Sequence, residues 1–66
     1  MPIVEVTLVS GRAPEELRAM ISAVTTAVSQ SVAAPVSSIR VIVREVPTTH
    51  FAAGDVTIAE RTAAVT

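Results

Sequence analysis

Apolar and polar residues alternate over residues 2–9, near the start of the chain. This segment is rich in β-branched side chains and is followed by Ser10-Gly11, a combination that is typical of a strand. Proline is tolerated at the first position of a strand, where no ladder hydrogen bond needs its nitrogen. One face of the predicted strand is entirely apolar, and it consists of Pro2, Val4, Val6 and Leu8.

Residues 14–33 have the spacing of an amphipathic helix. Pro14 suits the first helical position, and Glu15 and Glu16 suit the positive end of the helix dipole. Larger apolar residues then recur every three or four positions, as Leu17, Met20, Ile21, Val24, Val28 and Val32. We expect the helix to end near Ala33, because Pro35 cannot continue it.

A second β-branched segment covers residues 39–46 and ends at Pro47. Two strands separated by one helix form a βαβ unit, so we expect parallel strands joined by a right-handed crossover. The tail contains a short apolar stretch, residues 56–58, which we expect to form a small hairpin or an arm on a neighbouring copy. The prediction is an α/β (α+β) fold in which residues 1–66 form a single domain.

The chain is short for the amount of apolar sequence that it carries. It has 66 residues, of which 50% are hydrophobic, and its mean hydropathy is +0.59. Small domains gain stability from disulfides, metals or oligomerisation, and this chain has no cysteine and a single histidine. Two strands do not make a stable sheet on their own. We therefore expect copies of the chain to dimerise into a four-stranded sheet and to associate further.

Charge and composition argue against several classes of protein. Five arginines, no lysine and six acidic residues give a net charge of −1, so there is no basic surplus for nucleic acid. Without cysteine there is no disulfide framework and no thiolate metal site. No apolar run is long enough to span a membrane, and no secretory signal is recognisable. We expect a cytoplasmic protein that binds neither nucleic acid nor membrane.

The most unusual chemical group lies at the N-terminus, where Met1 precedes Pro2. A small second residue such as proline permits removal of the initiator methionine, and we expect Met1 to be removed. Removal leaves a rigid secondary amine, which acts as a general base when an apolar pocket and nearby arginines disfavour its protonated form. The alternative is an ordinary proline at the start of a strand. His50 stands alone, and we interpret it as a structural or solvated residue.

Two arginines and one aromatic residue are the other candidates for chemistry. Arg40 starts the second strand, and parallel pairing places it near Pro2. Arg12 follows the first strand, so it reaches a Pro2 only from a copy that runs antiparallel. The arginine fork binds carboxylates through two hydrogen bonds, while the alternative for each arginine is a solvated charge. Phe51, the only aromatic residue, is either a core residue or a pocket wall.

These motifs together resemble the 4-oxalocrotonate tautomerase family, the small members of the tautomerase superfamily. The resemblance covers nearly the whole chain and lies in Met1-Pro2-Ile3, Gly11-Arg12, residues 34–43, Glu45 and His50-Phe51. An N-terminal proline alone would be weak evidence. Its combination with these other motifs, in a chain of this length, is quite specific.

The resemblance implies the tautomerase fold, in which βαβ subunits form antiparallel dimers and three dimers form a hexamer. We expect a homohexamer, with a heterohexamer as the alternative. The resemblance also implies a small-molecule carboxylate substrate, with Pro2 as the general base and acid and Arg12 as the residue that grips the carboxylate. The resemblance further implies that Arg40 contacts the carbonyl or hydroxyl oxygen and a carboxylate oxygen of the substrate, and that Phe51 forms a wall of the pocket.

The implied reaction is the isomerisation of an enol to a ketone in a 2-hydroxy-dienoate or a similar 2-oxo acid. Neutral Pro2 takes the proton on the enol side and returns it to a carbon further along the conjugated system. The arginines stabilise the charge that develops on the oxygens. The resemblance implies that neither a metal nor an organic cofactor is required.

The tail departs from the family pattern and leaves alternatives open. After Phe51 the family has a Gly-rich turn with a bulkier apolar residue, whereas residues 52–55 here are Ala-Ala-Gly-Asp. Residues 60–65 faintly resemble one subunit of heterohexameric dehalogenases, so a non-catalytic or partner subunit of a hetero-oligomer is one alternative. A hydratase or dehalogenase on the same scaffold ranks lower, because Ala53 cannot activate water and Asp55 lies too far along.

Overall fold

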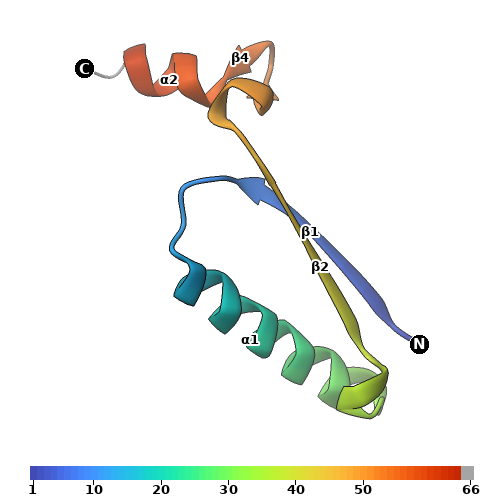
Figure 1. Cartoon of the computed structure of the whole chain (residues 1–66). Helices are drawn as coiled ribbons and strands as arrows, with labels where there is room; N and C mark the ends of the chain where they lie inside the picture. The colour runs from blue at the N-terminus through green and yellow to red at the C-terminus, as the bar shows by residue number, and fades with distance from the viewer. Residues whose placement is uncertain (65–66) are drawn as a thin grey trace.

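The computed structural model describes residues 1–64 as a βαβ unit followed by a small C-terminal module, residues 48–64 (Figure 1). The elements, in chain order, are β1 (Ile3–Val9), α1 (Pro14–Val32), η1 (Val36–Ser38), β2 (Arg40–Val46), η2 (Thr48–His50), β3 (Ala52–Ala53), β4 (Val56–Thr57) and α2 (Ile58–Ala64), where η denotes a short 3-10 helix. The predicted βαβ unit and the predicted C-terminal hairpin are both confirmed.

The strands β1 and β2 are parallel and in full register over their length. Ile3 lies opposite Arg40 at one end, and Val9 lies opposite Val46 at the other. The pairing extends by one residue at each end, because the Arg40 N–H donates to the Pro2 carbonyl at 3.0 Å and the Ser10 N–H donates to the Val46 carbonyl at 2.8 Å. Pro2 therefore lies just outside the strand, yet its carbonyl group is fixed by the sheet.

Helix α1 covers one face of this two-stranded sheet and leaves the other face open (Figure 1). The side chains of β1 alternate accordingly, with Val4 and Val6 half-buried and Ile3 60% exposed. Among the described residues only Ile39, at 8% exposure, is buried, and no side chain is completely enclosed. Val32, which the helical spacing assigns to the inward face, is instead 61% exposed at the last turn of α1.

Local interactions set both ends of α1. Glu16 Oε1 accepts a hydrogen bond from the Ala13 N–H at 2.9 Å, which satisfies a main-chain donor at the start of the helix. At the other end Ala33 has φ 53° and ψ 41°, in the left-handed region, and its N–H bonds to the Ser29 carbonyl. Pro35 follows two residues later, so the helix ends where the sequence predicts.

Replacing Ala33 by glycine is expected to stabilise the protein. The left-handed conformation costs an L-residue with a Cβ atom roughly 1 kcal/mol, and glycine adopts it without that cost. The Ala33→Gly variant should therefore unfold at a higher temperature, measured at a fixed protein concentration. The matched control is Ala27→Gly in the middle of α1, where glycine should lower the midpoint by a similar amount. A lower midpoint for Ala33→Gly would contradict this interpretation of the helix end.

In the C-terminal module, the hairpin β3–β4 turns on Gly54 and Asp55, which both have positive φ, 58° and 67°. Positive φ at both central residues is the geometry of the tight turns that suit two-residue hairpins. Of the short stretch at residues 56–58, Val56 and Thr57 form β4 of the hairpin, and Ile58 begins the helix α2. Thr57 and Glu60, spaced as in a capping box, explain why the chain becomes helical at Ile58.

The protomer is elongated rather than compact. Its dimensions are 46 × 24 × 15 Å and its radius of gyration is 15.3 Å, whereas a compact chain of this length has about 11 Å. Its accessible surface is 4758 Å², against about 4000 Å² for a compact protein of this mass. The open face of the sheet includes Ile42, which is 47% exposed. A protomer of this shape leaves apolar surface that a further copy could cover.

Candidate active site

The start of β1 and the start of β2 form one end of the sheet, and two of the predicted site residues meet there. Pro2 is half-buried, and its carbonyl oxygen accepts the Arg40 N–H. The Arg40 side chain is exposed, and its Nη1 donates to the Ser37 carbonyl at 3.0 Å. This bond places the guanidinium beside η1, so a cation lies at the same end of the sheet as the Pro2 backbone.

The opposite end of the sheet carries the other two predicted residues. Arg12 follows β1, and its Nη1 donates to the Val9 carbonyl at 3.2 Å. Gly11 precedes it with φ +127°, a conformation that favours glycine and turns the chain away from the strand. Phe51 follows β2 and η2 and is 37% exposed, so it is not a core residue of the protomer.

These two pairs are too far apart to act together within one protomer. Ile3 and Val9 are six residue steps apart along β1, which corresponds to roughly 20 Å along the sheet. A second copy that runs antiparallel would bring its own Arg12 and Phe51 to the Pro2 end of the first. In such a pair, one chain would supply two half-sites, each with one arginine, rather than one complete site.

The surroundings of the candidate residues show no other catalytic cluster. His50 is exposed, and its Nδ1 lies 2.8 Å from the Thr49 hydroxyl. Across residues 1–64, no three side chains of the kind that bind metals come together. In the same part of the chain, no helix combines the length and the apolar character needed to cross a bilayer.

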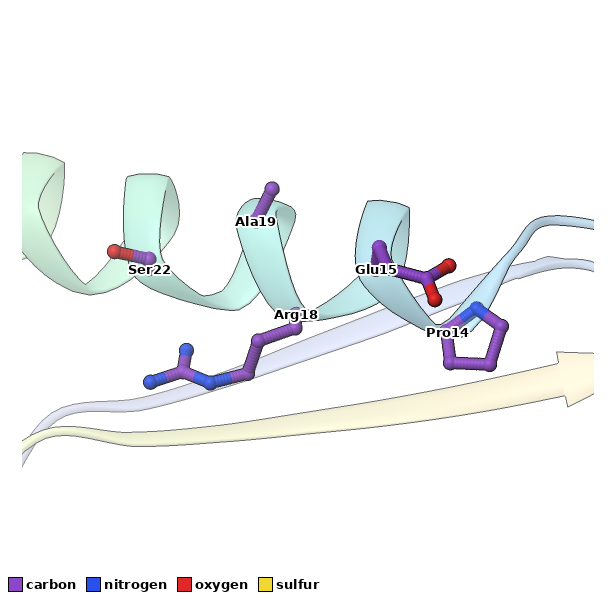
Figure 2. A pocket seen from close by; sticks show the side chains of 5 residues that line it. All are labelled: Pro14, Glu15, Arg18, Ala19 and Ser22. Carbon is purple, nitrogen blue, oxygen red and sulfur yellow. The ribbon is translucent and has the colours of Figure 1, made fainter.

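Two surface hollows of the protomer lie beside α1, and none of the four predicted residues lines them. Figure 2 shows the first of them, lined by Pro14, Glu15, Arg18, Ala19 and Ser22. A second hollow continues along the helix, from Arg18 and Ser22 to Val36 beside η1. Both are shallow surfaces of exposed or half-buried helix residues. Neither contains Pro2 or the arginines at the strand ends, so we do not assign the reaction to them.

Sequence reasoning missed the helix α2 and the hydrogen bonds that hold it. Hydrogen bonds from Thr57, first from its main-chain N–H and then from its side-chain hydroxyl, keep the pKa of the Glu60 carboxyl below its usual value. The available signal was the sequence Thr57-Ile58-Ala59-Glu60, which has the spacing of a capping box. The β-branched residues at 56–58 favour a strand locally, so the capping-box spacing was not recognised as the start of a helix.

Comparison with known proteins agrees with the motifs and the fold. A sequence model described as "Tautomerase enzyme" matches residues 2–61. A 2-hydroxymuconate tautomerase from Stutzerimonas stutzeri is 41% identical over 54 residues, which is 82% of this chain and 86% of that protein. A probable tautomerase from Ralstonia nicotianae is 43% identical over 51 residues, or 77% of this chain and 73% of the relative.

Solved structures show the same architecture. TomN, a 4-oxalocrotonate tautomerase homologue from the tomaymycin biosynthetic pathway, superposes with a TM-score of 0.95 at 38% identity, covering 98% of this chain and all of TomN. A heterohexameric 4-oxalocrotonate tautomerase from Chloroflexus aurantiacus gives a TM-score of 0.88 at 30% identity, with 91% of this chain and 97% of that chain covered. The chain is therefore a member of the tautomerase family, a family of isomerases.

Proposed function

We propose that the protein interconverts the enol and keto forms of a 2-hydroxy-dienoate or a similar 2-oxo acid, with the amine of Pro2 as general base and acid. The observation that carries the proposal is the placement of the four residues. Pro2 and Arg40 share one end of the sheet, and Arg12 and Phe51 share the other. Two antiparallel copies then combine a base, two cations and an apolar wall in one site.

The proposed base exists only after Met1 has been removed. With Met1 attached, the Pro2 nitrogen is part of an amide and is not basic. Met1 is 78% exposed, which is compatible with access by a processing enzyme. The freed secondary amine is held at the sheet end through the Pro2 carbonyl, and an apolar site near arginines favours its neutral form.

Proton transfer then needs no metal and no organic cofactor. The Pro2 nitrogen accepts the proton of the enol hydroxyl. The carbon that carried this hydroxyl becomes a carbonyl carbon, and the conjugated double bond of the substrate shifts by one position. The protonated amine returns the proton to a carbon at the far end of the conjugated system. Arg40 stabilises the charge that builds on the oxygen in the transition state, and Arg12 holds the carboxylate throughout.

The assembly that completes this site is proposed to be a homohexamer, built as a trimer of antiparallel dimers. The exposed Ile3 and Ile42 on the open face of the sheet supply apolar surface for contacts beyond the dimer. The solution mass of the purified chain tests this. A mass of six copies supports the proposal. Co-purification with a second, similar chain would favour the hetero-oligomer, an assembly reported for the Chloroflexus aurantiacus relative.

Turnover of 2-hydroxymuconate by the purified chain, followed as loss of absorbance of the conjugated dienol, tests the function directly. The sample must first be shown by intact mass to lack Met1. Fast ketonisation without added metal, unaffected by a chelator, is the expected result. Failure of the processed homo-oligomer to act on 2-hydroxymuconate or phenylenolpyruvate would overturn the proposal and favour a partner-subunit role.

The two arginines are expected to affect different kinetic parameters. Arg12→Ala should raise KM by about tenfold with kcat little changed, because it removes a contact made equally before and during the reaction. Arg40→Ala should lower kcat by about a hundredfold, because its contact strengthens as charge develops. Steady-state kinetics of both variants measure the difference.

Arg18→Ala is the control for the loss of one positive charge, since Arg18 lies on α1 beside the surface hollow and away from both strand ends. Its kcat and KM should match those of the unmodified chain. If Arg12→Ala and Arg40→Ala also left both parameters unchanged, neither arginine would belong to the site.

A further inference from the structure

Phe51 depends on the C-terminal module for its position. Its carbonyl oxygen accepts the Ile58 N–H at 2.9 Å, which ties the residue before β3 to the first residue of α2. In Figure 1 the module lies beyond the end of the sheet, on the side away from α1. The main chain of Phe51 is therefore held by a hydrogen bond from within the C-terminal module.

The parts of this module are individually weak. Strands β3 and β4 have two residues each, and α2 has seven. Isolated hairpins are marginal in water, and so are helices much shorter than about 12 residues. Something other than hairpin and helix propensity must hold the module together.

Two sets of hydrogen bonds link its parts. Thr57 and Glu60 bond reciprocally: the Thr57 N–H and hydroxyl donate to Glu60 Oε1 at 3.0 and 2.8 Å, and the Glu60 N–H donates to Thr57 Oγ1 at 3.1 Å. Arg61 Nη2 then donates to the Ala53 carbonyl at 3.3 Å, which joins α2 to β3. The Glu60 carboxylate is an ionised acceptor at neutral pH, and the hydrogen bonds from Thr57 lower its pKa further.

We propose that Thr57, Glu60 and Arg61 are positioning residues that hold Phe51 in place as the wall of the active site. The capping box fixes the backbone at Thr57, which aims the next N–H at the Phe51 carbonyl. Arg61 prevents α2 from swinging away from the hairpin. The statement about the active site rests on the proposed function, whereas the statement about the position of Phe51 does not.

The chain contains one phenylalanine and no tryptophan or tyrosine, so a fluorine label on phenylalanine reports on Phe51 alone. The folded oligomer labelled with 4-fluorophenylalanine should give one ¹⁹F resonance that differs from that of the denatured chain. Glu60→Ala should move this resonance towards the denatured position. Glu60→Gln, which keeps an acceptor oxygen, should restore most of the original shift.

Thr62→Ala is the matched control, because Thr62 is an exposed threonine on the same helix and has no hydrogen bond among those that hold the module. It should leave the resonance unchanged, while Thr57→Val should move it. An unmoved resonance in both Glu60→Ala and Thr57→Val would overturn the proposal, because Phe51 would then be held by other contacts.

Kinetics separate positioning from a merely structural role. Glu60→Ala should raise KM by about fivefold, the size expected for loss of one cap, with kcat within about twofold, and Glu60→Gln should reverse most of the change. If the resonance moves while KM stays constant, Phe51 is not a wall of the site and the proposal is wrong in that part. If the unmodified chain has no turnover, the proposed function fails, and the ¹⁹F result still decides whether the module positions Phe51.

Discussion

Substituting Pro2 by alanine is expected to lower kcat/KM for ketonisation of 2-hydroxymuconate by about a hundredfold or more, the usual contribution of a general base. Alanine at this position still permits Met1 removal and leaves a primary amine. That amine lacks the ring that fixes the nitrogen at the end of β1. The main-chain carbonyl remains, so its hydrogen bond from the Arg40 N–H is retained and the fold is expected to be unchanged.

Two controls make the result specific to the amine. Intact mass of each sample establishes that Met1 has been removed from both proteins. A preparation that retains Met1 has the natural Pro2 side chain but an amide nitrogen, and it should be at least as inactive as Pro2→Ala. Turnover at the level of the unmodified protein in either sample would show that the Pro2 nitrogen does not carry the proton.

Mixing two impaired variants is expected to restore activity, because the half-sites lie at opposite ends of the sheet. In an antiparallel pair formed by one Pro2→Ala chain and one Arg12→Ala chain, one site contains both substitutions and the other contains neither. Unfolding and refolding an equal mixture should recover roughly a quarter of the unmodified activity for random pairing in a two-fold symmetric dimer. Substrate is kept below KM so that the Arg12 defect is visible.

The matched control places both substitutions in one chain. When the Pro2→Ala/Arg12→Ala double variant is refolded with the unmodified protein, every mixed pair contains two defective sites, so activity should fall below that of simple dilution. Each single variant refolded alone gives the baseline. If the two single variants do not complement each other after exchange, the base and Arg12 belong to the same protomer or to no common site.

The βαβ unit could be predicted from the residues alone because the spacing of apolar residues changes sharply between the first strand and the helix. The alternating pattern of residues 2–9 and the three- and four-residue spacing of α1 leave one reasonable arrangement, and the right-handed crossover then orders the strand ends. The opposite locations of Arg12 and Pro2 follow from that arrangement. The start of α2 did not follow, since β-branched residues at 56–58 favour a strand locally and the Thr57–Glu60 hydrogen bonds outweigh that preference.

The side-chain positions of Arg40 and Phe51 were harder to predict. Arg40 bonds to the Ser37 carbonyl in the protomer, and the direction of a long exposed side chain depends on which copy packs beside it. The same holds for Phe51, whose main chain is fixed by Ile58 while its ring is partly open to solvent. The sequence pattern identified the residue types and the strand ends, but in the proposed assembly the final side-chain contacts would form between chains.

Ile39, at 8% exposure, is the single side chain that the described part of the protomer buries, and this has a kinetic consequence for a newly synthesised chain. A monomer with so small an interior has little on which to collapse, so for the proposed assembly the productive folding step is the encounter of two chains. Folding is then second order in chain concentration. At low expression, chains spend longer as unfolded monomers and are exposed to proteolysis before they meet.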